Sequence, residues 1–239
     1  MKKKIILFLF SLAGALVLIL SLDYSGFLNL KIGRGGKQTV EDVMERIGAR
    51  IEFKYQNLFR TSQVEFPPNA LLLIVYKEEK ILELWGKSNS DFKRITSYRI
   101  RKASGLPGPK LLEGDQQVPE GIYDIIGLNP NSRFHLSLKL DYPNSYDKEK
   151  ALIDGRVTLG GDIFIHGKDV SIGCLAMGDD VAEELFALVA KVGKENVRVI
   201  ISPNKNVLKI KDHNYPFWID DLYSRIRFAI KNKNSMATI

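Results

Sequence analysis

Two apolar, β-rich runs separated by a short charged turn constrain the fold of this chain most strongly. ALLLIVY begins at Ala70, shortly after Pro67 and Pro68, and KILELWG follows across Lys77–Lys80. Such a pair of runs joined by a polar turn predicts a β-hairpin. A third run around 95–100 extends the hairpin. The centre of the chain is therefore expected to begin a β-meander.

Helical patterns precede and follow these strands. Thr39 and Asp42 have the spacing of a capping box, and the apolar face that follows continues to near Arg60. A second helix is expected over 179–193 and a third over 216–231. Further strands are predicted at 121–126, 134–140, 162–166 and 196–201. These patterns indicate an α+β fold that is mainly β.

The N-terminus has the pattern of an export signal. MKKK is followed by Ile5–Leu22, in which only Ser11 and Ser21 are polar. At about 1.5 Å per residue this segment approaches the roughly 30 Å of a bilayer core, and no clean A-x-A site precedes Asp23. Residues 1–22 are therefore predicted to be a cleaved signal peptide or a retained signal anchor, with everything after Leu22 exported.

Cys174 is the only cysteine in 239 residues. Exported proteins that need covalent cross-links use cysteines in pairs, so no intramolecular disulfide is possible here. The thiol must be buried and inert, intermolecular, or reactive.

A nearby histidine favours the reactive interpretation. A thiol with a pKa near 8.5 needs a base or positive electrostatics to act as a nucleophile. His166 ends a predicted strand eight positions earlier, and a hairpin-like reversal through Lys168–Ser171 could return the chain to Gly173-Cys174. Amides around Gly173 and Cys174 could bind an oxyanion. The same spacing also fits a buried inert cysteine and a histidine that caps a strand.

The residues of this segment resemble a known family. His166-Gly167 followed by Ser171-Ile172-Gly173-Cys174 is similar to the active-site signature of the L,D-transpeptidase (YkuD-type) catalytic domain, whose usual form is His-Gly, a spacer and Ser/Thr-His-Gly-Cys. The short spacer and the wording SIGCLAMGDD resemble its YafK-like branch. Flanking motifs agree: GPKLLEGD at 108–115, Pro119-x-Gly121-x-Tyr123 and FHLSLKLDYPN at 134–144.

The resemblance implies a β-sandwich or barrel with a helix after the nucleophile and helical additions at both ends. It divides the chain into a signal at 1–22, a linker and helical segment at 23–69, a catalytic domain at 70–203 and a helical extension at 204–239.

The family pattern also assigns roles to the site. It makes Cys174 the nucleophile and His166 its general base. Ser171 or a nearby backbone carbonyl would orient the imidazole, and the amides of Gly173 and Cys174 would face the oxyanion. Two positions depart from the pattern: Ile172 replaces a second histidine, and Ala176 stands near a usual Asn or Arg. Candidates for substrate binding are His135, Tyr123, Arg156, Lys168 and Gly167.

The implied function is cysteine-dependent acyl transfer on peptidoglycan stem peptides in the periplasm or cell envelope, with no cofactor. Resolution of the thioester by water would instead make the chain a peptidase or amidase that cleaves wall cross-links or releases wall-linked protein. A degenerate site would leave a peptidoglycan-binding module.

The composition is compatible with these partners. Without the three lysines of MKKK the net charge falls from +7 to +4 (7 − 3), which suits a carboxylate-bearing substrate but is equally typical of an ordinary surface. No nucleic-acid partner is expected, and membrane contact is expected only through the N-terminal segment, which would anchor the chain to the inner membrane if it is retained. The three histidines are dispersed and no CxxC or HExxH occurs, so no metal site is predicted.

Overall fold

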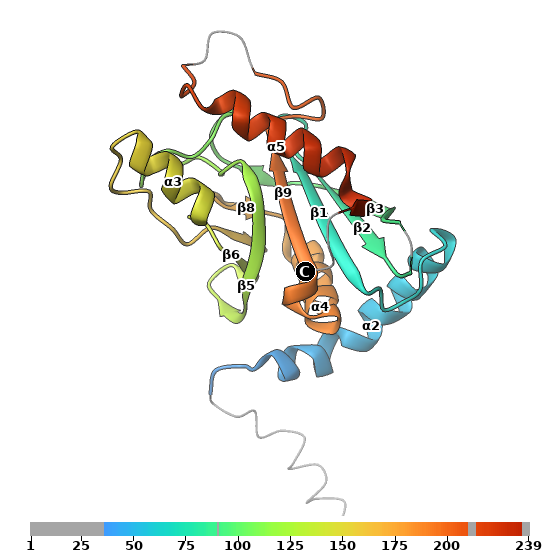
Figure 1. Ribbon diagram of the computed structural model, residues 1–239. Helices are drawn as coiled ribbons and strands as arrows, with labels where there is room; N and C mark the ends of the chain where they lie inside the picture. Colours follow the sequence, from blue (N-terminus) through green and yellow to red (C-terminus); the bar gives the residue numbers. More distant parts are fainter. Residues whose placement is uncertain (1–35, 90, 210–213, 236–239) are drawn as a thin grey trace, which may run out of the picture. The chain divides into compact units, whose positions relative to one another are not determined.

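The computed structural model describes residues 36–89, 91–209 and 214–235 (Figure 1). The predicted signal at 1–22 lies outside these residues. Within the described ranges no helix is both long and apolar enough to cross a bilayer. Residues Gln38–Ile239 form one compact unit, and the fold below is that of this unit.

The unit contains four described α-helices and nine strands. In chain order they are α2 (Val40–Thr61), β1 (Ala70–Tyr76), β2 (Ile81–Lys87), β3 (Lys93–Arg99), β4 (Lys102–Ala103), β5 (Gly121–Ser132), β6 (His135–Leu140), α3 (Ser145–Ile153), β7 (Phe164–His166), β8 (Leu175–Ala176), α4 (Asp179–Val192), β9 (Val197–Ser202) and α5 (Ile219–Lys231).

All nine strands belong to one mixed sheet in the order β3-β2-β1-β9-β5-β6-β7-β8-β4. Neighbours are antiparallel except β1 with β9 and β7 with β8. The predicted meander is confirmed, with Ala70 opposite Lys87 and Tyr76 opposite Ile81. The α+β class is confirmed as well, but the described helices cover about as many residues as the strands, so the fold is less dominated by β-structure than expected.

The expected sandwich or barrel is replaced by a single continuous sheet because β5 is shared. Its first part, Gly121–Asp124, pairs with β9, and from Ile125 onward the strand pairs with β6. Two register shifts interrupt the β5–β6 ladder. Irregularities of this kind bend and twist a strand, so one long strand can connect two differently directed halves of a sheet.

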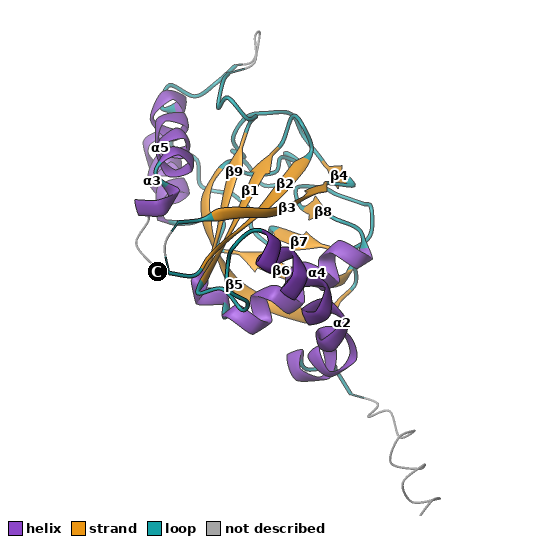
Figure 2. Ribbon diagram, turned by 90° about the vertical axis from the view of Figure 1, so that its right-hand side faces the viewer, coloured by secondary structure: helices purple, strands orange, loops and turns teal. Residues whose placement is uncertain are grey.

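The sheet is covered on both faces, which explains the unbroken apolar run of β1. Leu71, Leu73 and Val75 join the core that includes buried residues of α2 and α4. Leu72 and Ile74 join a second core with α5. Figure 2 shows these helices on opposite sides of the sheet. Strands buried on both faces read as continuous hydrophobic segments rather than alternating ones.

Most predicted helix boundaries agree with the structure. Asp42 N donates to Thr39 Oγ1 and Thr39 N donates to Asp42 Oδ2, which completes the predicted capping box of α2. Helix α4 follows its prediction closely, whereas α5 begins at Ile219. Helix α3 is not anticipated from the sequence, because Ala151 is its one buried residue. Its sequence signal is a second capping box at Asn144 and Asp147.

Candidate active site

The candidate site lies where β7, β8 and their connecting loop meet. β7 ends at His166, and β8 begins at Leu175, directly after Cys174. The two strands are parallel, with Ile165 opposite Leu175 and His166 opposite Ala176. The expected hairpin-like reversal is therefore wrong. Loop 167–174 returns the chain to the start of β7, so that β8 runs beside β7 in the same direction. His166 is level with Ala176, two residues beyond Cys174.

The start of this loop requires glycine. A Cβ at Gly167 would lie 2.6 Å from Asp179 Oδ1 and 2.7 Å from Phe134 O, closer than any side chain tolerates. The Asp179 carboxylate, at the start of α4, accepts from Lys168 N at 2.9 Å and from Lys168 Nζ at 2.6 Å. Loop 167–174 is thus fixed to α4 immediately after His166.

Two serines fix the other end of the loop. Ser171 Oγ donates to Cys174 O at 2.6 Å, and Gly173 N donates to Ser104 Oγ at 2.6 Å. Ser104 N in turn donates to Ser171 Oγ at 3.2 Å. Ser171 therefore holds the backbone of Cys174 rather than the imidazole of His166. The imidazole contacts a backbone carbonyl instead, as described below. The Gly173 amide is already donated to Ser104, so it is not free to bind an oxyanion in this conformation.

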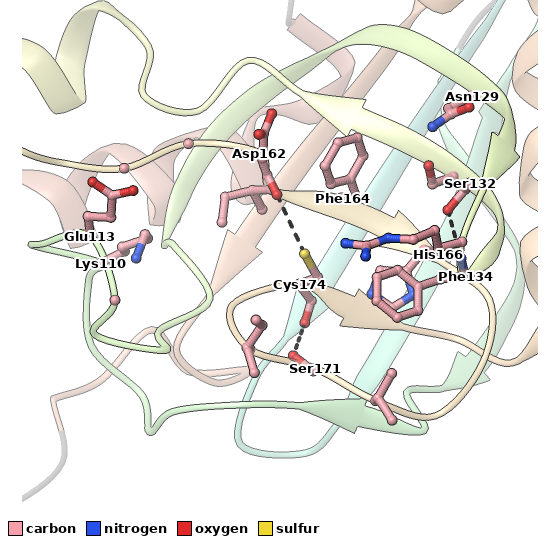
Figure 3. A pocket seen from close by; sticks show the side chains of 18 of the residues that line it. Lys110, Glu113, Asn129, Ser132, Phe134, Asp162, Phe164, His166, Ser171 and Cys174 are labelled. Atoms are coloured by element: carbon pink, nitrogen blue, oxygen red, sulfur yellow. Dashed lines mark hydrogen bonds between the residues drawn. The ribbon is translucent and has the colours of Figure 1, made fainter.

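Cys174 and His166 line the same cavity of about 820 Å³ (Figure 3). Its wall combines apolar and polar groups from the loop before Asp115, the β5–β6 turn, β7 and loop 167–174. Its charged or polar side chains include Lys110, Glu113, Asn129, Ser132, Arg133, Asp162 and Ser171. Pockets of this volume are typical of sites for small or peptide-sized ligands.

The thiol of Cys174 is protonated at rest. Sγ donates to the carbonyl oxygen of Asp162 at 3.6 Å. Burial raises the pKa of the Cys174 thiol above its ordinary value of 9.0, and the Asp162 charge adds to the rise. A backbone hydrogen bond from Phe164 and the charge of Lys110 lower this pKa without cancelling the shift. Removal of the thiol proton is therefore a step that a base must assist.

His166 has the protonation state that a base requires. The side chain is 2% exposed, and its ring stacks on Phe134 with centroids 4.7 Å apart. Burial lowers the pKa of His166 below its ordinary value of 6.5, and the contact with Gly167 opposes this only in part. Nδ1 lies 2.6 Å from Gly167 O. Since a carbonyl can only accept, Nδ1 carries the proton and Nε2 keeps a lone pair.

The imidazole and the thiol are not hydrogen-bonded to each other among the residues that the structure describes. The sulfur bonds Asp162 O and the imidazole bonds Gly167 O. Catalytic contacts are often long in ligand-free sites and tighten when substrate binds. Rotation of the sulfur away from Asp162 would be needed to bring it toward the histidine.

Two of the predicted substrate-binding residues contact acidic side chains of α4 outside the cavity lining. His135 Nε2 lies 2.9 Å from Glu183 Oε1 on α4, and Lys168 pairs with Asp179 as described. Neither side chain is among those that line the cavity in the described part of the chain. Their roles toward a substrate stay predictions.

Two other predicted substrate-binding residues are held away from the cavity: Tyr123 lies in the interior, and Arg156 is bonded to the loop that contains Leu111. Tyr123 is buried, and its hydroxyl donates to Glu120 O at 3.1 Å and to Asp147 Oδ1 at 3.3 Å. Arg156 Nη1 donates to Leu111 O at 2.8 Å. These contacts anchor loops around the site, and neither residue, nor Gly167, belongs to the described cavity wall.

Comparison with known proteins identifies the family. The profile of the YkuD family, the L,D-transpeptidase catalytic domain, matches residues 71–201. The chain belongs to this family. The matched segment lies within the 70–203 range over which the sequence motifs resemble L,D-transpeptidases.

Individual proteins are similar to parts of this chain. YafK of Escherichia coli (strain K12) is 34% identical over 154 residues, which span 60% of this chain and 60% of that protein. Less than two thirds of YafK is therefore matched. The helical cell shape determining protein Pgp2 from Campylobacter jejuni, as its K307A mutant, superimposes with a TM-score of 0.48 at 22% identity and covers 84% of this chain and 64% of that chain. L,D-transpeptidase 1 of Mycobacterium tuberculosis gives a TM-score of 0.33 at 11% identity, with 55% and 61% covered.

The two departures from the L,D-transpeptidase pattern differ in their surroundings. Ile172 is 82% exposed and lines the cavity, so the wall near the nucleophile is apolar where the pattern has an imidazole. Ala176 is fully buried in β8. A larger polar side chain at that position would have to enter the core, so its absence leaves no gap in the cavity wall.

Three cavity or loop residues escape the motif analysis. Ser104 holds loop 167–174 although it lies far away in sequence. Glu113 belongs to GPKLLEGD, and Arg133 directly precedes FHLSLKLDYPN, yet neither is singled out by residue type or spacing. For Glu113 and Arg133, the position within or beside a matched motif was the one sequence signal that could have drawn attention to them.

Proposed function

We propose that this chain catalyses cysteine-dependent acyl transfer on peptidoglycan stem peptides in the cell envelope. The observation that supports it most directly is the presence of Cys174 and a neutral, oriented His166 on the wall of one cavity. Membership of the L,D-transpeptidase family supports the choice of peptide substrate. The relative YafK carries the same activity in its name.

The first half-reaction would form a thioester. His166 Nε2 takes the thiol proton while Sγ attacks a peptide carbonyl, and the C–S bond forms as the carbonyl becomes an oxyanion. The imidazolium then gives its proton to the departing amine nitrogen as the C–N bond breaks. The Gly167 carbonyl keeps Nδ1 protonated and stabilises the imidazolium between these two steps.

The second half-reaction would pass the acyl group to an amine. The acceptor nitrogen loses a proton to His166 as it attacks the thioester, and the proton returns to sulfur when the C–S bond breaks. Bulk water near 55 M competes at this step, so a transferase must hold the acceptor against the thioester.

The role of His166 is tested by alkylation of Cys174 with iodoacetamide. In His166→Ala the reaction at neutral pH should slow by roughly tenfold, because the thiol loses its base. Since the pKa of the thiol is raised, the rate should recover toward that of the parent chain only at alkaline pH. The parent chain should in turn lose reactivity only below pH 6.5, where the depressed pKa of His166 lies.

His135→Ala is the matched control, because this second histidine pairs with Glu183 away from the cavity. Its alkylation profile should match that of the parent chain. If His166→Ala and the parent chain alkylate identically at every pH, the histidine is structural.

The choice between amine and water is tested with purified wall fragments. Supplied with an excess of a D-amino acid or a stem-peptide amine, the enzyme should form exchanged or cross-linked product faster than free acid. Mass spectrometry of the products separates the outcomes. Free acid alone, unaffected by added amine, would assign the chain to the peptidases or amidases, and binding without any product would leave a peptidoglycan-binding module.

A further inference from the structure

Two charged side chains on the cavity wall have no partner among the residues that the structure describes. In the described residues the Arg133 guanidinium and the Glu113 carboxylate form no hydrogen bond or ion pair, yet both line the cavity that contains Cys174. Both residues are exposed. Charged groups in a concave wall that stay unpaired are available to a ligand of opposite charge.

The other cavity charges are already neutralised. Lys110 Nζ lies 2.5 Å from Asp115 Oδ1 and also donates to Leu112 O. Asp162 Oδ1 lies 2.6 Å from Lys139 Nζ. His166 is neutral, as shown above. In the described cavity wall, Arg133 and Glu113 are therefore the charged side chains without a partner of opposite charge.

The segments that carry these two charges line the cavity on opposite sides of Cys174. Figure 3 shows Glu113 beside Lys110 on one side of Cys174, and Ser132 and Phe134 on the other. Arg133 lies between Ser132 and Phe134 in the turn that joins β5 to β6. A ligand that crosses the sulfur thus meets a cation at one end and an anion at the other.

We propose that Arg133 binds a carboxylate and Glu113 binds an ammonium group of one substrate that lies across Cys174. This inference deepens the proposed function and rests on it for the peptide nature of the ligand. The substrate class is a short peptide with a free carboxylate on one side of the attacked carbonyl and, on the other, a free side-chain amine such as a diamino acid supplies.

The two contacts differ in what they recognise and together set direction. A guanidinium presents parallel N–H donors that match both oxygens of a carboxylate, and a carboxylate accepts strongly from an ammonium group. A peptide bound in the reverse direction would place like charges together at both ends. Opposed charges therefore select one orientation of the chain over Cys174 as well as one class of ligand.

The experiment compares three synthetic peptides that contain a diamino acid: one with the carboxylate and side-chain amine free, one with the carboxylate amidated and one with the amine acetylated. Turnover is measured with the parent chain, Arg133→Gln, Glu113→Gln and the control Arg60→Gln. Arg60 is an exposed arginine on α2 outside the cavity, so its substitution removes the same charge elsewhere.

We expect Arg133→Gln to raise KM for the free peptide by about tenfold to a hundredfold, the usual effect of losing a hydrogen bond to a charged group, with kcat changed little. Amidation of the carboxylate should raise KM of the parent chain by a similar factor and should add nothing in Arg133→Gln. Acetylation of the amine should likewise raise KM of the parent chain, and it should add nothing in Glu113→Gln. Arg60→Gln should behave as the parent chain does.

The inference is overturned if Arg133→Gln penalises the amidated and the free peptide equally, or leaves KM of both unchanged, while the parent chain turns them over. If no peptide is turned over by any variant, the proposed function fails instead. Calorimetric binding of the same three peptides to Cys174→Ala, with and without Arg133→Gln, then decides. The inference is supported if amidation of the carboxylate weakens binding only when Arg133 is present. It is overturned if the affinity depends on neither the carboxylate nor Arg133.

Discussion

Cys174→Ala should lower turnover of wall peptides by at least about a thousandfold and leave the fold intact. The change removes the one atom that can form the thioester, and loss of a covalent nucleophile has effects of this size or larger. The side chain is only partly buried, and its sulfur makes one weak hydrogen bond, to Asp162 O. The thermal midpoint should therefore stay within a few degrees of that of the parent chain.

Product formation and thermal unfolding must be measured on the same preparation. Activity retained by a folded Cys174→Ala protein would contradict the assignment of the nucleophile. Activity lost together with a large fall in thermal midpoint would instead mean that the thiol position supports the fold.

Lys77→Met should destabilise the protein by about 3–5 kcal/mol, the usual result of leaving one member of a buried ion pair uncompensated. Lys77 Nζ lies 3.2 Å from Glu120 Oε1, and both side chains are almost completely buried. Burial lowers the pKa of Lys77, and the attraction of Glu120 opposes that shift. Lys77 Nζ also donates to Gly108 O and Val118 O at 2.7 Å, so these carbonyls lose their donor too.

Denaturant unfolding measures the change in the free energy of unfolding. The double variant Lys77→Met/Glu120→Gln should recover part of the loss, because it no longer buries a lone carboxylate. Tyr223→Phe is a milder control: it removes only the hydroxyl that donates to Glu120 Oε2 at 2.9 Å and should cost about 1.5–3 kcal/mol, as expected for a hydrogen bond to a charged group. A Lys77→Met protein as stable as Tyr223→Phe would show that the pair contributes little.

The parts of the fold that depend on local pattern are predictable from the sequence. The capping of α2 by Thr39 and the β1–β2 hairpin each depend on residues that are close together in the sequence, and the structure has both. The pairing of β5 with two different partners is a contact between distant segments, and no local period reports it. Strands β4 and β8 have two residues each, too few for any period to appear, so the parallel return to Cys174 could not be foreseen.

The candidate site divides in the same way. Cys174 and His166 are found because a rare residue type and a motif coincide in one segment. Arg133 and Glu113 are charged residues of common types, and what distinguishes them is the lack of a partner in three dimensions. Ser104 acts on a loop 69 positions away, through its contact with Gly173. Tertiary placement, rather than residue type, makes such groups visible.

Helix α5 shows that the family segment is not the physical unit of this protein. The family match ends at residue 201, but the second core continues into Trp218, directly before α5, and into Leu222 and Ile226 of α5. The hydroxyl of Tyr223 also reaches the buried Glu120 carboxylate. A fragment trimmed to the matched segment would expose an apolar sheet face to water, with the hazards of aggregation that follow. Loss of α5 by proteolysis would thus disrupt the matched segment irreversibly, by uncovering one face of its sheet.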